Sequence, residues 1–124
     1  MRMIKIEKQL AVFLDNRPGA LARTCQALSH AKINILALSV LDTVDHAVVR
    51  MVVDDTSAAE QVLSKMHATV HGRDIIFMEI QNETGVLSRV AEQLARAGIN
   101  LEYAYCATVP TNKSGALILR TNDL

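Results

Sequence analysis

Two short polar segments combine residue types that can bind a small zwitterion. They read Asn16-Arg17-Pro18-Gly19-Ala20-Leu21 and Asn82-Glu83-Thr84-Gly85-Val86-Leu87. Each follows an alternating apolar segment and precedes a helical apolar stripe, so each is expected to connect a strand to a helix. The free N–H groups of a helix N-terminus favour a carboxylate, and glycine lets a ligand approach the main chain. The asparagine amide can both donate and accept, which suits the two ends of an amino acid.

A structural interpretation of the same segments stays open. The asparagine can cap the helix, and the glycine can permit the turn. The recurring Arg23 and Arg89 lie one turn further along each helix, where they either belong to a solvated face or help to hold a carboxylate. Both alternatives concern the same expected strand-to-helix loops.

The other residues with chemical potential form no recognisable catalytic or metal-binding pattern. The histidines are scattered, and neither a Ser-His-Asp order nor a phosphate-binding glycine motif is present. Two cysteines are too few for a disulfide framework and are expected to pack in the core. We therefore predict a protein that is not an enzyme, with no catalytic residues, no metal site and no cofactor. The residues concerned are His30, His46, His67, His71, Cys25 and Cys106.

The chain contains an internal duplication. Residues 16–35 align with residues 82–101 without a gap at an offset of 66, and eight of the twenty positions are identical. Unrelated segments do not match in this way, so the repeat is expected to decide the architecture. By this alignment Lys32 stands where the second copy has Gly98, at a position after the helix that favours left-handed dihedrals.

Hydrophobic periodicity places the same elements in both copies. In copy one we expect a strand over 4–14, a helix over 19–31, a strand over 33–41 and a strand from Asp45 to Val53. A second helix follows, capped by Asp55 or Ser57 with a possible Ser57–Glu60 capping box, and then a short strand over 68–71. In copy two we expect a strand over 74–80, a helix carrying Leu87 to Leu94, and strands over 99–107 and 116–121.

This order predicts an α+β fold of the ferredoxin-like βαββαβ type, as two tandem modules at 1–72 and 73–124. The second module lacks its last helix and strand, which is expected to leave a strand edge unpaired. In the strand over 33–41 we expect Leu36, Leu38 and Val40 on the sheet face opposite the helices. An apolar stripe of this size must be covered by the sister module or by another chain, so we expect a homodimer or other oligomer.

Composition narrows the range of partners. The 124 residues carry thirteen basic and thirteen acidic side chains, and only 3% are aromatic. A nucleic-acid or anionic-membrane binder would show a basic surplus, and a single-strand binder would need aromatic faces. No apolar run reaches the length of a membrane span and no secretory signal is visible. We expect a cytoplasmic protein with no nucleic-acid or membrane partner.

The Asn-Arg-Pro-Gly-Ala-Leu segment, the Lys-Ile-Asn-Ile segment and the repeat of both resemble the ACT domain family. The resemblance covers nearly the whole chain and implies small stand-alone tandem ACT proteins of bacteria, a ferredoxin-like fold and amino-acid binding that regulates metabolic enzymes. It also implies ligand contacts between modules, from the loop of one and the strand of another. Serine-binding members carry a histidine where this chain has Leu14 and Ile80, so the resemblance does not name the effector. Transferred by position, the implied ligand contacts are Asn16, Pro18, Gly19, Ala20, Leu21 and Asn34 in copy one, and Asn82, Gly85, Val86, Leu87 and Asn100 in copy two.

The sequence thus predicts a non-catalytic regulatory protein that binds a small effector, most simply an amino acid, at module or subunit interfaces. Binding in copy one is favoured, because Glu83-Thr84 makes the second loop more acidic and less rigid than Arg17-Pro18 does the first. One alternative is a subunit that docks on a metabolic enzyme without binding an effector. A second is RNA binding, since the RRM shares the βαββαβ order, but its central aromatic residues are not matched here.

Overall fold

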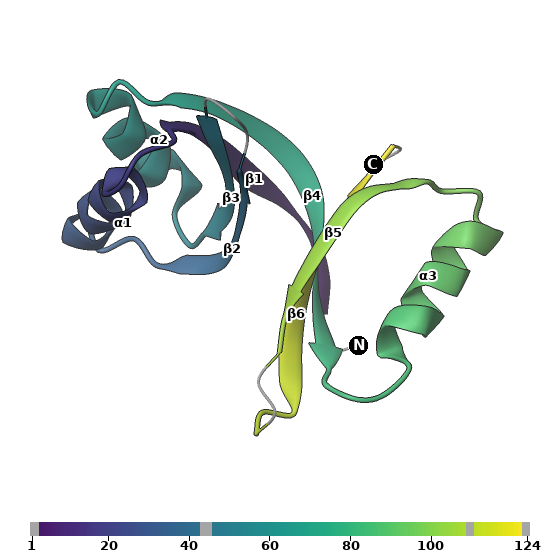
Figure 1. The fold of residues 1–124 in the computed structure, drawn as a ribbon. Helices are drawn as coiled ribbons and strands as arrows, with labels where there is room; N and C mark the ends of the chain where they lie inside the picture. The colour runs from purple at the N-terminus through teal and green to yellow at the C-terminus, as the bar shows by residue number, and fades with distance from the viewer. Residues whose placement is uncertain (1–2, 43–45, 109–110, 123–124) are drawn as a thin grey trace. The chain divides into compact units, whose positions relative to one another are not determined.

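The computed structural model describes residues 3–42, 46–108 and 111–122 (Figure 1). Six strands form an antiparallel sheet of order β2-β3-β1-β4-β6-β5, accompanied by three helices. This α+β architecture confirms the predicted ferredoxin-like type. The elements are β1 (Met3–Asp15), α1 (Ala20–His30), β2 (Ile35–Asp42), β3 (His46–Val53), α2 (Thr56–Lys65), β4 (Thr69–Gln81), α3 (Val86–Arg96), β5 (Leu101–Ala107) and β6 (Ser114–Thr121).

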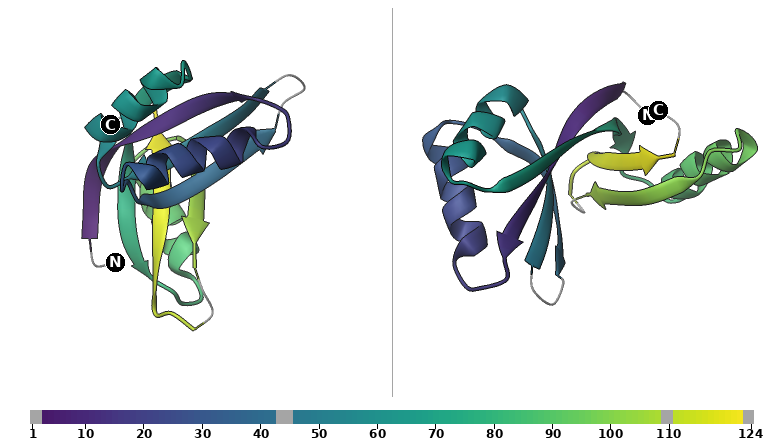
Figure 2. Two further views of the ribbon diagram at one scale, coloured as in Figure 1. Left: turned by 90° about the vertical axis from the view of Figure 1, so that its left-hand side faces the viewer. Right: turned by 90° about the horizontal axis from the view of Figure 1, so that it is seen from above.

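The chain divides into two compact units. The first unit is Lys8–Arg73, and the second unit joins Met1–Glu7 to Asp74–Leu124. In the first unit β2, β3, the later part of β1 and the early part of β4 form the sheet, and α1 and α2 lie together on one of its faces (Figure 2, left). Its core consists of apolar side chains from all these elements, with Leu10, Leu28, Val49, Met51 and Leu63 fully buried. Burying this set supplies most of the driving force for folding.

The second unit uses the start of the chain as a strand. Its sheet contains the early part of β1, the later part of β4, β6 and β5, and α3 is its helix among the described residues (Figure 2, right). The Lys5 ammonium lies 5.8 Å from the ring centre of Phe77, which places the two strands side by side. Among the described residues, copy two itself contributes one helix, α3, and three strands, the later part of β4, β5 and β6. The expected unpaired edge is wrong, however, because the first residues of β1 occupy that place next to β4.

The end of copy one also differs from the prediction. The expected separate strands over 68–71 and 74–80 are one continuous strand, β4, which runs through Gly72. Of the two possible caps of α2, Asp55 is correct, since its carboxylate accepts a hydrogen bond of 3.1 Å from the Ala58 N–H. The capping box is wrong, because Glu60 pairs with Lys8 instead, at 3.2 Å.

Strand β2 contains an irregularity that changes the face of its apolar side chains. The register shifts between Ile35 and Ala37, after which Leu38 lies opposite Met51 and Val40 opposite Val49. Directly opposed residues in an antiparallel pair share a face, and Met51 and Val49 belong to the helix-covered core. Leu38 and Val40 therefore lie on the helix side, not on the opposite face as expected, since a bulge of one residue reverses the alternation. Both remain exposed, as do Leu36 and Leu41.

Each helix ends in the same way. The residue after the C-cap is left-handed at all three helices, with φ of 61° at Lys32, 59° at His67 and 70° at Gly98. Their N–H groups donate to carbonyl oxygens of the last helical turn, at 2.9 to 3.0 Å. The left-handed position predicted for Lys32 is confirmed, whereas its counterpart His67 was not predicted.

Candidate functional site

The two strand-to-helix loops have the same backbone course. After β1, the Arg17 N–H bonds the Asp15 carbonyl at 2.9 Å, and Gly19 adopts φ 87° directly before α1. After β4, the Glu83 N–H bonds the Gln81 carbonyl at 3.0 Å, and Gly85 adopts φ 90° directly before α3. Glycine adopts this left-handed conformation without steric cost, so the duplicated residue pattern corresponds to a duplicated turn.

Unlike α2, helices α1 and α3 have an N-cap residue without a side chain that could cap the helix. Gly19 and Gly85 are the N-cap residues, and neither can offer an oxygen to the first-turn N–H groups. The proposal that the loop asparagines cap the helices is therefore wrong. Instead, the Asn16 amide donates to the Asp42 carboxylate at 2.7 Å, and the Asn82 amide donates to the Asn112 carbonyl at 3.1 Å. These bonds brace each loop from the side and leave the helix N-terminus available to an anion.

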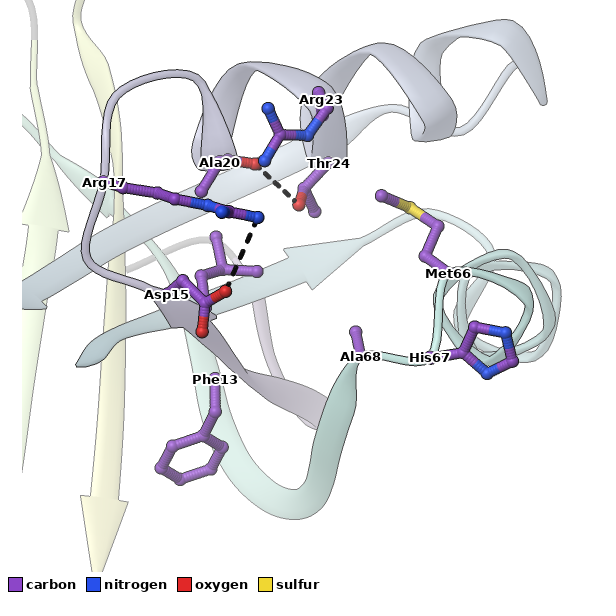
Figure 3. Close-up of a pocket in the computed structure, with 10 residues that line it drawn as sticks. Phe13, Asp15, Arg17, Ala20, Arg23, Thr24, Met66, His67 and Ala68 are labelled. Carbon is purple, nitrogen blue, oxygen red and sulfur yellow. Dashed lines mark hydrogen bonds and ion pairs between the residues drawn. The ribbon is translucent and has the colours of Figure 1, made fainter. Parts of the chain in front are cut away.

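A cavity of about 270 Å³ lies beside the loop of the first unit (Figure 3). One side is formed by the end of β1, the loop and the start of α1, and the other by the turn between α2 and β4. Arg17 and Arg23 extend over this cavity, opposite Met66 and Ala68 (Figure 3). The lining residues are Phe13, Leu14, Asp15, Arg17, Ala20, Arg23, Thr24, Met66, His67 and Ala68.

The polar groups of this cavity leave one cation without a partner. Arg17 is held loosely by Asp15, with 3.6 Å between Nη2 and Oδ2, and the Thr24 hydroxyl donates to the Ala20 carbonyl at 3.0 Å. Among the described residues Arg23 has no ion pair or hydrogen bond from its side chain. The cavity therefore combines an uncapped helix N-terminus with an available guanidinium, and both attract a carboxylate.

A second cavity, of about 340 Å³, lies beside the loop of the second unit, where the start of α3 and the end of β5 line it instead of a turn like that between α2 and β4. Arg89, the counterpart of Arg23, bonds the Glu83 carboxylate at 2.8 Å. Glu83 stands where the first loop has Arg17, and Gln81 stands where it has Asp15. These positions together with the helix arginine carry one net positive charge in the first unit and none in the second. The remaining wall is largely apolar, with Val86, Leu87 and the exposed Cys106 among its members. Cys106 is thus not packed in the core as expected, while Cys25 is half-buried.

The strand asparagines do not meet the loop of their own unit. Asn34 and Asn100 come directly before β2 and β5, at the end of the helix remote from the loop, and a helix of 11 residues is about 16 Å long. The turns before β2 and β5 are held by hydrogen bonds from the asparagine backbone to other side chains. The Asp54 carboxylate accepts from the Asn34 N–H at 3.0 Å, and the Asn122 amide oxygen accepts from the Asn100 N–H at 3.2 Å.

Of the predicted ligand contacts, the structure brings together the loop residues of each copy and separates them from the strand asparagine. The cavity also contains residues that the sequence did not indicate, above all Met66 and His67, which follow α2. These two residues lie near the loop because α2 packs beside α1, and the local sequence does not indicate this packing.

Within 3–42, 46–108 and 111–122, no group of three or more His, Cys, Asp or Glu residues could hold a metal ion. No described helix is both long and apolar enough to span a membrane.

Comparison with known proteins finds solved structures with the same fold. No curated protein sequence matches the chain. Protein BT0572 from Bacteroides thetaiotaomicron is similar in structure, with 28% identity, a TM-score of 0.89, and coverage of 97% of this chain and 82% of that one. The fold is shared with the ligand-free regulatory subunit of aspartate kinase from Thermus thermophilus, at 18% identity and a TM-score of 0.72, covering 94% of this chain and 85% of that one. The regulatory subunit of aspartate kinase from Thermus flavus also shares the fold, at 20% identity and a TM-score of 0.60, with coverage of 94% of this chain and 86% of that one.

A family model described as an ACT domain pair matches residues 4–124. The match spans both units and both loops, and it confirms the resemblance indicated by the duplicated motif. The chain belongs to the ACT domain pair family.

Proposed function

We propose that this protein is a non-catalytic, cytoplasmic regulatory subunit that binds an amino acid at the loop of its first unit and transmits the binding to a metabolic enzyme. Membership of the ACT domain pair family supports the regulatory role. The fold shared with regulatory subunits of aspartate kinase supports an enzyme as the partner. The observation that carries the proposal is the available Arg23 beside the uncapped N-terminus of α1.

The effector carboxylate would accept hydrogen bonds from Arg23 and from the N–H groups of Leu21 and Ala22, because the Ala20 N–H already bonds the Arg17 carbonyl at 3.3 Å. A helix N-terminus is equivalent to roughly half a positive charge, and hydrogen bonds to charged groups contribute about 1.5–3 kcal/mol each. Asp15, at the end of β1, lines the cavity and provides an acceptor for the ammonium group, and the adjacent Asn16 is bonded to Asp42 at the end of β2. In the second unit Glu83 already occupies Arg89, so an anion there must compete with an ion pair. We therefore expect the first unit to bind an acidic or zwitterionic effector more tightly than the second.

A second copy of the chain would complete the site. Strand β2 is at the edge of the sheet and exposes Leu38 and Val40, an arrangement that favours pairing with another strand. If two β2 strands pair antiparallel about Leu38, residue 42 of one chain faces residue 34 of the other. This register would bring Asn34 of the second copy to Asp42, which Asn16 already bonds. The pairing would thus unite the loop and strand asparagines that a single unit keeps apart.

The proposal is tested by thermal denaturation and calorimetry with each of the common amino acids. An effector at about 100 times its Kd should raise the free energy of unfolding by roughly 2.7 kcal/mol. Arg23→Gln should weaken binding about tenfold or more, since it removes a charge-assisted hydrogen bond. Arg89→Gln is the matched control and should leave the affinity unchanged.

The absence of stabilisation by any amino acid at millimolar concentration would contradict effector binding. A stable complex with an enzyme that forms equally with and without amino acids would then support the docking subunit without an effector. Leu38→Asp should convert the dimer to a monomer in light scattering and weaken effector binding at the same time. Binding that survives in the monomer would contradict a site shared between two copies.

A further inference from the structure

Two arginines and one carboxylate line the cavity of the first unit. Arg17 reaches the cavity from the loop after β1, and Arg23 reaches it from the first turn of α1 (Figure 3). Asp15 is the acidic residue of the lining, and its Oδ2 atom lies 3.6 Å from Nη2 of Arg17. The other lining residues are apolar apart from Thr24 and His67, and neither of these carries a negative charge. The charged side chains of the cavity therefore sum to one net positive charge.

The Arg23 guanidinium is folded back over the start of its own helix. A Cβ atom on Gly19, the N-cap residue, would lie 3.3 Å from Nη1 of Arg23. A carboxylate bound by the free N–H groups of the first turn would therefore meet this guanidinium as well. Arg23 thus serves the carboxylate that the proposed function places at the N-terminus of α1, which leaves Arg17 for another group of the ligand.

The second unit shows which group satisfies a helix arginine in this position. A Cβ atom on Gly85 would lie 3.5 Å from Nη1 of Arg89, so Arg89 is folded back over α3 in the same way. Its Nη2 atom donates to the carboxylate of Glu83 at 2.8 Å, and Glu83 stands where the first loop has Arg17. The chain thus supplies its own acidic group in the second unit. Among the described residues no carboxylate takes this place for Arg23, so the acid has to come from a ligand.

The ion pair between Asp15 and Arg17 is weak enough for a ligand to rearrange it. Its separation of 3.6 Å exceeds the roughly 2.7–2.9 Å of a charge-assisted hydrogen bond. The Arg17 and Asp15 side chains are 65% and 69% exposed, and ion pairs this exposed contribute little to stability. Asp15 can therefore turn to an ammonium group and Arg17 to a carboxylate, and no buried interaction is lost.

The uncharged wall of the cavity indicates the size and the middle part of the ligand. The volume of about 270 Å³ lies just below the roughly 300–1,000 Å³ of pockets that enclose drug-sized ligands, so it suits a single amino acid. Met66 and Ala68 lie opposite the two arginines (Figure 3), and Met66 is 37% exposed. Methylene groups of a ligand would cover this exposed apolar side chain. A short aliphatic chain between two acidic ends fits both the wall and the charges.

We propose that the cavity of the first unit is specific for an amino acid with a second carboxylate in its side chain, of the aspartate and glutamate class. The α-carboxylate contacts Arg23 and the N-terminus of α1, the ammonium group contacts Asp15, and the side-chain carboxylate contacts Arg17. Such a ligand carries one net negative charge and neutralises the cavity, whereas a neutral amino acid leaves one positive charge and a basic amino acid adds to it. The inference rests on the proposed function and names the effector class of the same site.

Calorimetry of the full chain with matched pairs of ligands tests this specificity. Glutamate is compared with glutamine and aspartate with asparagine, because each amide has the shape of its acid without the charge. For at least one of the two side-chain lengths the acid should bind about three- to fivefold more tightly, as expected for an exposed ion pair. Glutarate has both carboxylates and no ammonium group, and it should bind more weakly than glutamate.

Three variants test whether Arg17 causes the preference. Arg17→Gln should make the affinities for acid and amide equal, mainly by weakening the acid. Arg17→Glu places the residue of the second loop in the first and should disfavour the acid, because the new carboxylate competes for Arg23 as Glu83 does for Arg89. Arg96→Gln removes the same charge from an exposed arginine in the last turn of α3 and should leave the preference unchanged. Circular dichroism verifies that each variant retains the fold.

The possible results separate this inference from the proposed function. Equal affinity for acid and amide at both side-chain lengths would overturn the specificity, although amino-acid binding itself would stand. A preference for the acid that Arg17→Gln leaves unchanged would overturn it too, as would tighter binding of a neutral or basic amino acid than of either acid. Glutarate binding as tight as that of glutamate would show that the ammonium group is not recognised, and the ligand class would then be wrong. The absence of binding by every amino acid would instead contradict the proposed function, and the specificity with it.

Discussion

Replacing Lys32 by glycine is expected to stabilise the protein, although it removes a charged side chain and adds a flexible residue. Lys32 adopts φ 61° after α1, and Gly98 adopts φ 70° at the equivalent position after α3. Both N–H groups bond the helix end in the same way, at 2.9 and 3.0 Å. The two copies thus share one backbone conformation, which glycine adopts freely and lysine does not.

The size of the effect follows from two opposing terms. The left-handed conformation costs a residue with a Cβ atom about 1–2 kcal/mol, and glycine raises the entropy of the unfolded chain by about 0.4–1 kcal/mol. The net gain for Lys32→Gly is therefore about 0.5–1 kcal/mol, or roughly 2–4 °C in Tm for a chain of this size. Gly98→Ala should lose a similar amount, and a Cβ atom there would meet nothing within 4 Å, so the loss is a backbone effect.

Urea and thermal denaturation of four proteins test this reasoning: the parent chain, Lys32→Gly, Lys32→Ala and Gly98→Ala. Lys32→Ala retains the Cβ atom and removes the charge, so it should be close to the parent. Equal stability of Lys32→Gly and Lys32→Ala would refute the backbone argument. It would show that the lysine side chain, rather than its dihedral angle, sets the stability of this turn.

Two further changes follow from the packing. Asp55→Ala should lower the free energy of unfolding by about 1 kcal/mol in chemical denaturation, because it removes the carboxylate that accepts from the Ala58 N–H. Asp55→Asn keeps an oxygen at this position and should lose much less stability. Leu28→Ala should cost about 2–5 kcal/mol and Leu94→Ala clearly less, since Leu28 is fully buried and Leu94 only in part; equal losses would mean that Leu94 is covered in solution.

The parts of the fold that the sequence predicted are those with a local or repeated signal. The duplicated Asn–Gly loop correctly indicated two strand-to-helix turns, and the alignment of Lys32 with Gly98 indicated a left-handed residue after α1. The resemblance to the ACT domain family was confirmed by a family model that matches residues 4–124, which include both loops. A turn conformation depends on a few neighbouring dihedrals, so its sequence pattern is informative.

The errors concern relations between distant segments. The bulge in β2 moves Leu38 and Val40 to the helix side, and one extra residue in a strand has no distinct composition. The first residues of β1 join the sheet of the second unit, where Lys5 contacts Phe77, 72 positions later in the sequence. The local sequence of these first residues does not indicate this pairing. The approach of Met66 and His67 to the first loop likewise depends on how α2 packs, which a hydrophobic stripe does not specify.

The two loops show how chemistry can diverge on a conserved backbone within a single chain. Gly19 and Gly85 differ by only 3° in φ, so the two turns are equivalent. The cavities beside them differ in side-chain charge and also in their walls, since Met66 and Ala68 line the first and Cys106 and Thr108 line the second. The exchange of Arg17 for Glu83 is a charge reversal that is partly offset by Gln81 in place of Asp15, and Glu83 engages Arg89, the counterpart of Arg23 at the start of α3. The backbone repeat thus provides the same strand-to-helix turn twice, and the charges and cavity walls beside each turn favour anion binding at the first.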